Sequence, residues 1–204
     1  MSLCTLADVK AFLGIAALDT EHDAALNTQI AGVSAQLARA AGRIHDEIGV
    51  LEATTGAIQW FSPEPRTRLV YLAAYPVISI TEIKEAAFGA FDDADALVEN
   101  EDYQILKARG RLTRVGFWLP GEQTVRVTYN GGYTAADDTP GKGETALPDD
   151  VVGAAIKQVA FYFRRRDQLG VTSAGVAGGS YTTYARDELL PDVRETMNRF
   201  ARTL

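Results

Sequence analysis

The spacing of apolar residues changes twice along this chain of 204 residues, and the change limits the folds open to it. Up to residue 48, apolar side chains recur every three or four positions, as on one face of a helix. Between residues 57 and 129 they alternate with polar ones, as in strands, and near residue 150 the helical spacing returns. The sequence therefore predicts an α+β fold, a helical core with an inserted antiparallel β subdomain. The expected domains are residues 1–54 with 146–204 for the discontinuous core, and residues 55–145 for the β subdomain.

Long helices are expected in the core. They cover residues 20–48, residues 150–169 and a C-terminal segment in which Pro191 occupies the first turn. A shorter helix opens at Thr5, because Asp8 follows at the spacing of a capping box, and it ends at Gly14. The core is therefore expected to combine helices from both ends of the chain.

Six segments between the helices have the alternation of strands. They are AIQWF, RLVYLAAYPV, ISITEIKE, YQILK, RLTRV and TVRVTY. In the last of these, Val125, Val127 and Tyr129 share one face. Pro120 and Gly121 mark a turn before it.

Composition and charge indicate the compartment of the protein and limit the partners that it can bind. No apolar run approaches the roughly 20 residues of a membrane-spanning helix, and a single cysteine, Cys4, indicates a reducing compartment. The net charge of −7 argues against tight, non-specific DNA binding. Residues 151–204 hold eight basic and five acidic side chains, a net of +3; the other 12 basic and 22 acidic side chains give residues 1–150 a net of −10.

The groups that most enzymes need are missing or badly spaced. His22 and His45 are expected to be exposed on one continuous helix, about 34 Å apart at ~1.5 Å per residue, too far to share a metal ion. The segment PGKGET has glycine where a phosphate loop needs serine or threonine. Ser173 and Ser180 have no histidine nearby in the sequence to act as a base. We therefore expect no enzyme, no catalytic residue, no metal site and no cofactor.

The helix expected over residues 150–169 has two distinct faces. Its core stripe comprises Val152, Ile156, Val159 and Phe163. On the opposite face, the candidate interface residues are Lys157, Phe161, Arg164 and Arg165. An exposed aromatic ring among cations is typical of a contact between proteins. The alternative is that the arginines only complement the negative end of the helix and keep the surface soluble.

An uncharged stretch rich in glycine follows this helix, over residues 171–184. Without charge it is ill suited to hold phosphate, and its glycines favour mobility. It is predicted to be a mobile loop that contacts a partner or lines a channel. The candidate residues are Gly175, Gly178, Gly179 and Tyr181.

Several local patterns occur in an order that resembles one family across nearly the whole chain. They are TLADVKAFLGI, AAGRIHDEIG, AAYPVISITEIKE, VRVTYNGGY, LPDDVVGAAIKQVAFYFRRRDQLG and LPDVRETMNRF. In this order the chain resembles the head–tail connector proteins of tailed bacteriophages, also called adaptor or head-completion proteins.

The resemblance implies a structural virion protein made in the host cytoplasm and located in the neck between head and tail. Such proteins form a homo-oligomeric ring, usually a dodecamer, that binds the portal protein, extends the DNA channel and docks the stopper or tail protein. Duplex DNA would pass through the ring without tight binding, and no membrane is involved.

Two other functions stay open at this point. One is a stopper or tail-completion protein, which would bind tail proteins rather than the portal. The other, from a different class, is a nucleic-acid-binding packaging module that uses the arginines of residues 164–166; it predicts duplex binding that weakens steeply with salt.

Overall fold

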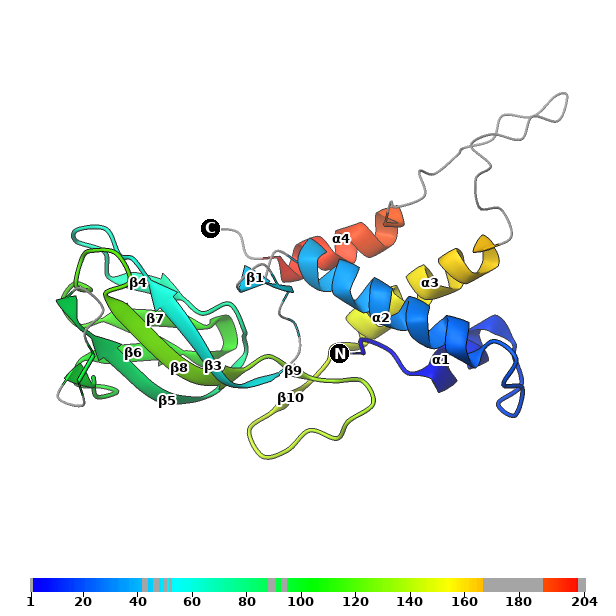
Figure 1. Ribbon diagram of the computed structural model, residues 1–204, viewed down its shortest axis with the longest axis horizontal. Helices are drawn as coiled ribbons and strands as arrows, with labels where there is room; N and C mark the ends of the chain where they lie inside the picture. Colours follow the sequence, from blue (N-terminus) through cyan, green and yellow to red (C-terminus); the bar gives the residue numbers. More distant parts are fainter. Residues whose placement is uncertain are drawn as a thin grey trace, which may run out of the picture. The chain divides into compact units, whose positions relative to one another are not determined.

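The computed structural model describes residues 2–41, 44–45, 48–49, 51, 53–87, 91–92, 95–166 and 189–201. Their helices and antiparallel sheets confirm the α+β fold (Figure 1). The chain divides into two compact units, which we call the helical unit and the β unit. The helical unit is residues 1–41 with 148–204, and the β unit is residues 42–147. The sequence placed these boundaries at residues 54/55 and 145/146.

In the described part of the helical unit there are four α-helices. They are α1 (Leu6–Leu13), α2 (Asp23–Ala40), α3 (Asp149–Arg164) and α4 (Pro191–Phe200). The start and end expected for α1 are confirmed: Thr5 Oγ1 accepts a hydrogen bond from the backbone N of Asp8 at 3.1 Å, and Gly14 has a φ of 74°. The other three helices all contact α3, which therefore lies at the centre of this unit.

The helix expected over residues 20–48 is wrong in its length. α2 ends at Ala40, and the chain then forms the short antiparallel strands β1 (Ile44–His45) and β2 (Ile48–Gly49). In the sequence a glycine follows Ala41, and β-branched isoleucines stand at both strands. Glycine weakens a helix and β-branched residues favour strands, so the helical spacing of these isoleucines is misleading.

The β unit contains two three-stranded antiparallel sheets, ordered β3-β8-β5 and β4-β7-β6. Their strands are β3 (Thr54–Phe61), β4 (Leu69–Tyr71), β5 (Val77–Glu85), β6 (Tyr103–Leu106), β7 (Arg111–Arg114) and β8 (Val125–Gly131). Five of the expected strands are confirmed, whereas the sixth, RLVYLAAYPV, forms a strand only over Leu69–Tyr71, and its last residue, Val77, begins β5. A short 3-10 helix, η3 (Lys107–Arg109), precedes β7, and β9 (Tyr133–Thr134) pairs with β10 (Thr145–Ala146) in parallel.

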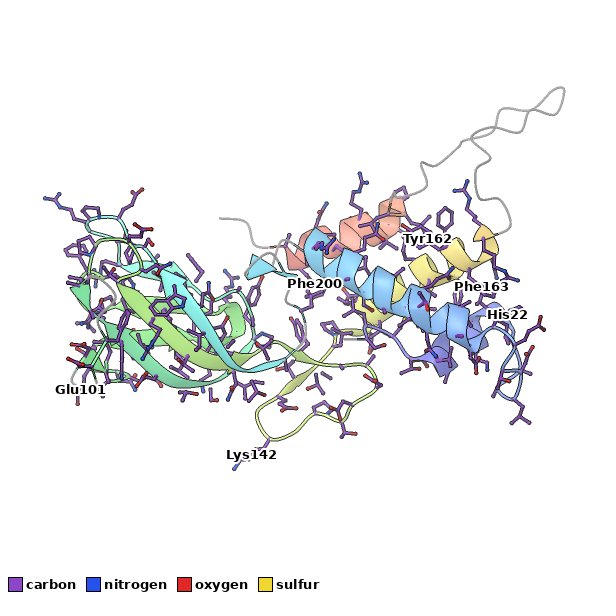
Figure 2. The ribbon with its side chains drawn as sticks, in the orientation of Figure 1. His22, Glu101, Lys142, Tyr162, Phe163 and Phe200 are labelled. Atoms are coloured by element: carbon purple, nitrogen blue, oxygen red, sulfur yellow. The ribbon has the colours of Figure 1, made fainter. Side chains whose placement is uncertain are left out.

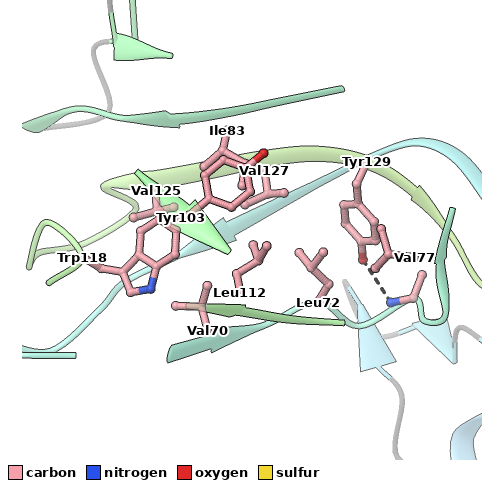
Figure 3. Close-up of a cluster of buried hydrophobic side chains, with 11 residues drawn as sticks. Val70, Leu72, Val77, Ile83, Tyr103, Leu112, Trp118, Val125, Val127 and Tyr129 are labelled. Carbon is pink, nitrogen blue, oxygen red and sulfur yellow. Dashed lines mark hydrogen bonds between the residues drawn. The ribbon is translucent and has the colours of Figure 1, made fainter. Parts of the chain in front are cut away.

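A core of apolar side chains from both sheets fills the β unit (Figure 3). Its members are Val70, Leu72, Ala74, Val77, Ile83, Tyr103, Leu112, Trp118, Val125, Val127 and Tyr129. The shared face predicted for Val125, Val127 and Tyr129 is confirmed, since all three are fully buried.

Three connections meet at one end of the β unit, and we call them the distal loops. They are residues 62–68 between β3 and β4, residues 86–102 between β5 and β6, and residues 115–124 between β7 and β8. Backbone hydrogen bonds join them, from Trp118 N to Thr67 O at 2.9 Å and from Val115 N to Asp102 O at 2.8 Å. The opposite end is where Thr54 pairs with Gly131, so the chain enters and leaves these sheets there.

Candidate interaction surfaces

The outward face of α3 carries the four residues expected to form an interface. Lys157 Nζ lies 3.0 Å from Asp192 Oδ2 on α4, and both side chains are more than half exposed. The Arg165 guanidinium lies over the Phe161 ring, 5.1 Å from its centroid. Phe161 is half-buried rather than exposed, whereas Arg164 is exposed. Contacts with α4 and within α3 therefore already order part of this face.

Two polar contacts fasten α4 to α3. The hydrogen bond from Lys157 holds the pKa of the Asp192 carboxyl below its ordinary value. Gln158 is fully buried on α3, and its Oε1 accepts a hydrogen bond from the backbone N of Leu190 at 3.0 Å. Because a buried carbonyl oxygen is costly unless bonded, this second contact holds the residue before α4 against α3.

The buried side of α3 is wider than the predicted stripe. Val159 and Phe163 are buried as expected, but Val152 and Ile156 are only half-buried. The buried residues of the helix are Val151, Ala154, Ala155, Gln158, Val159, Ala160 and Phe163. They surround most of the helix because α3 packs against three other helices. A single stripe describes a helix with one neighbour, so the prediction is wrong for the two half-buried residues.

His22 and His45 differ from the sequence prediction in exposure and in position. His22 is half-buried, not exposed, and its ring meets that of Phe163 edge to face with centroids 5.4 Å apart (Figure 2). Because α2 ends at Ala40, His22 and His45 do not share a helix. No group of three or more His, Cys, Asp or Glu side chains that could hold a metal ion occurs among the residues described above.

The structure describes the single cysteine but not the predicted mobile loop. The loop residues Gly175, Gly178, Gly179 and Tyr181 lie outside the described residues. Cys4 is fully buried, and this burial, with the nearby charge of Asp8, raises the pKa of its thiol to about 12. A thiol in this state is not a nucleophile at neutral pH.

The distal loops, together with the first residue of β4, carry an exposed apolar surface that was not predicted from the sequence. Leu69, Val115 and Phe117 are 41%, 55% and 57% exposed. Exposed Arg66 and Arg68 lie on the neighbouring segment, and Arg68 Nη2 donates to Val115 O at 3.1 Å. We call these five residues the distal patch. The only local signal is the run GFW in a turn, because the patch is assembled from separate loops.

A second missed feature is the loop between α1 and α2, residues 14–22, which we call the Leu18 loop. The Leu18 side chain is 95% exposed. Lys10 of α1 is buried beneath the loop. Its Nζ donates to Ala17 O at 3.1 Å, Asp19 O at 2.5 Å and Asp23 Oδ1 at 2.8 Å. All three protons of the ammonium group are thus used to hold the loop.

Among the helices of the described residues, none is long and apolar enough to cross a membrane.

No protein-family model and no curated protein matches this sequence.

Solved structures do match it. One is a chain in the virion of a native gene transfer agent particle, 18% identical, with a TM-score of 0.58 and coverage of 97% of this chain and 90% of that chain. Another is a chain in the neck of an empty particle of the same kind, computed with C6 symmetry: 20% identical, TM-score 0.55, the same coverage. This chain shares their fold. Because the match covers 97% of its residues, the likeness includes both the helical unit and the β unit.

Proposed function

We propose that this chain is a head–tail connector, an adaptor or head-completion protein in the neck of a tailed bacteriophage or phage-like particle. The observation that carries this proposal is the likeness to chains of a gene transfer agent virion and of such a particle's neck, which extends over 97% of the residues. The order of local patterns in the sequence supports the same family independently of the structure.

In this proposal copies of the chain form a ring, a dodecamer in the virion, beneath the portal protein. The ring extends the DNA channel and docks the stopper or tail protein. A net charge of −7 suits a conduit, since an acidic wall lets duplex DNA slide rather than hold it. The discontinuous helical core would form the body of the ring, with the β subdomain inserted in it.

The exposed face of α3 is the contact that we assign to a partner, either the next copy or the portal. It combines Arg164 with the Phe161 ring and the Arg165 guanidinium above it. Lys157 can join this contact, although Asp192 of the same chain pairs with it. An exposed ion pair is worth only about 0.2–1 kcal/mol, so exchange for an acidic residue of a partner costs little.

Negative-stain electron microscopy of the full chain over a range of concentrations, alone and with portal protein, tests the function. We expect closed rings with a central hole wide enough for duplex DNA. Arg164→Glu should reduce ring formation, whereas Arg199→Glu, an equal charge change on exposed α4, should not. Monomers at every concentration, with and without portal protein, would contradict the connector function.

A further inference from the structure

The Leu18 loop holds one apolar side chain, that of Leu18, exposed to solvent. The carbonyls on both sides of Leu18, from Ala17 and Asp19, accept hydrogen bonds from the buried Lys10 ammonium. The loop is fixed again where Asp19 Oδ1 accepts from the backbone N of Glu21 at 3.1 Å. A backbone segment that is already ordered loses little conformational entropy when a partner covers the side chain that it carries. Leu18 is therefore a preorganised anchor.

Acidic side chains lie next to this anchor. Asp19 and Glu21 lie one and three residues after Leu18 and are both exposed. Lys10, beneath the loop, is 4% exposed and faces inward to its three acceptors. The loop thus presents an apolar tip with a negative flank. A partner that fits it needs an apolar surface beside exposed cations.

Within the distal loops, which also carry exposed Glu64, Glu101 and Glu122, the distal patch has that chemistry and is also rigid. Its two segments are joined by Arg114 N to Arg68 O and by Trp118 Nε1 to Arg68 O, both at 2.9 Å. Trp118 itself is fully buried, so the segment bearing Val115 and Phe117 is anchored in the core. The patch therefore offers three apolar side chains and two exposed arginines on a fixed support.

We propose that the Leu18 loop of one copy docks on the distal patch of the next copy. Leu18 would be covered by Leu69, Val115 and Phe117. Asp19 and Glu21 would face Arg66 and Arg68. This inference rests on the proposed ring, in which each copy meets the next through two different surfaces. The two surfaces are different parts of the chain, so their pairing between copies is of this head-to-tail kind.

Crosslinking between variants that each carry one added cysteine tests the contact directly. Leu18→Cys and Val115→Cys chains are mixed and treated with a short bismaleimide, so that only contacts between chains give the mixed dimer. Native Cys4 does not react with the bismaleimide, because it is fully buried. The control replaces Val115→Cys by Leu106→Cys, which is comparably exposed at 42% but precedes η3, at the other end of β6 from the distal loops. We expect about tenfold more mixed dimer for the 18–115 pair than for the control pair, because proximity raises the effective concentration of the thiols.

A charge exchange separates a specific contact from chance association. Arg66→Glu and Glu21→Arg should each reduce the 18–115 crosslink several-fold, and the double variant should restore it. Equal crosslinking of the test and control pairs, or no rescue in the double variant, would overturn the contact.

Rings seen by microscopy with no 18–115 crosslink would refute this contact while leaving the connector function intact. A specific crosslink without rings, even with portal protein, would refute the connector function while leaving the contact intact. Absence of both refutes both.

Discussion

Tyr129 illustrates how single residues hold the β unit together. Its hydroxyl accepts a hydrogen bond from the backbone N of Ala74 at 3.0 Å and donates to Gln59 Oε1 at 3.1 Å. The same Gln59 oxygen accepts from the backbone N of Ala73 at 2.9 Å. Leaving such a buried group unpaired costs about 1–3 kcal/mol. The fully buried tyrosine therefore ties β8 to β3 and to the segment after β4.

Gly131, two residues farther along β8, is required by close packing. A Cβ added there would lie 2.4 Å from the carbonyl oxygen of Ala74, a backbone atom that cannot move alone. We expect Gly131→Ala to lower the free energy of unfolding of the β unit by about 1–3 kcal/mol, the usual cost of overpacking. Urea denaturation followed by tryptophan fluorescence measures it. Gly116→Ala is the matched control, because a Cβ at Gly116 meets nothing within 4 Å; equal stability of the two variants would refute the packing argument.

Among the elements of the β unit, the two sheets are joined electrostatically at their distal end. Arg114 at the end of β7 pairs with Glu85 at the end of β5, with Nη2 and Oε2 3.0 Å apart. The same guanidinium reaches Asp102, just before β6, with Nη1 and Oδ1 3.1 Å apart. Glu85 also accepts from the backbone N of Leu119. One arginine therefore connects two sheets and two distal loops.

These contacts make the β unit sensitive to acid. The backbone N–H of Val98 and the Arg114 guanidinium lower the pKa of Asp102, and Lys84 followed by Arg126 lowers that of Glu82. A carboxyl whose pKa is lower in the folded state stabilises the fold above its unfolded pKa. That stability is lost as the pH falls through the folded pKa.

We therefore expect the urea midpoint of the tryptophan signal to fall as the pH drops from 5 towards 3, about the range of unperturbed carboxyl pKa values and below. Asp102→Asn should flatten this dependence while lowering the midpoint at neutral pH. A midpoint that does not change with pH, or an equally steep decrease in Asp102→Asn, would contradict the assignment.

The elements differ in how far the sequence predicts them. Strands such as β8 could be predicted because buried residues alternate with less buried ones, as Val125 and Val127 do with half-buried Arg126. The end of α2 was not, because the isoleucines after Ala40 keep a helical spacing although they lie in strands. The distal patch and the Leu18 loop were not predicted. The exposure of their side chains depends on which loops meet and on the direction in which a buried lysine points. Neither has a local pattern.

For the whole molecule, the β unit is an insertion whose two connections lie side by side. Thr54 at the start of β3 pairs with Gly131 at the end of β8. The pairing continues outward, from Ala53 N to Tyr133 O at 2.7 Å and from Tyr133 N to Leu51 O at 2.8 Å. An inserted unit whose ends are close together can fold without distorting its host. We therefore expect the two units to unfold separately.

The chain carries its own probe for each unit. Both tryptophans, Trp60 and Trp118, lie in the β unit, whereas the single cysteine, Cys4, is buried in the helical unit. Along a urea series, tryptophan fluorescence should report one transition and the reactivity of Cys4 with a thiol reagent another. Leu37→Ala, a fully buried position on α2, should lower the cysteine midpoint by the equivalent of about 2–5 kcal/mol and leave the tryptophan midpoint in place.

Gly131→Ala should have the opposite effect, lowering the tryptophan midpoint and sparing the cysteine midpoint. Two superimposable transitions that move together in both variants would show a single cooperative unit instead. That result would mean that the paired segments around Thr54 and Gly131 transmit unfolding from one unit to the other, rather than merely joining them.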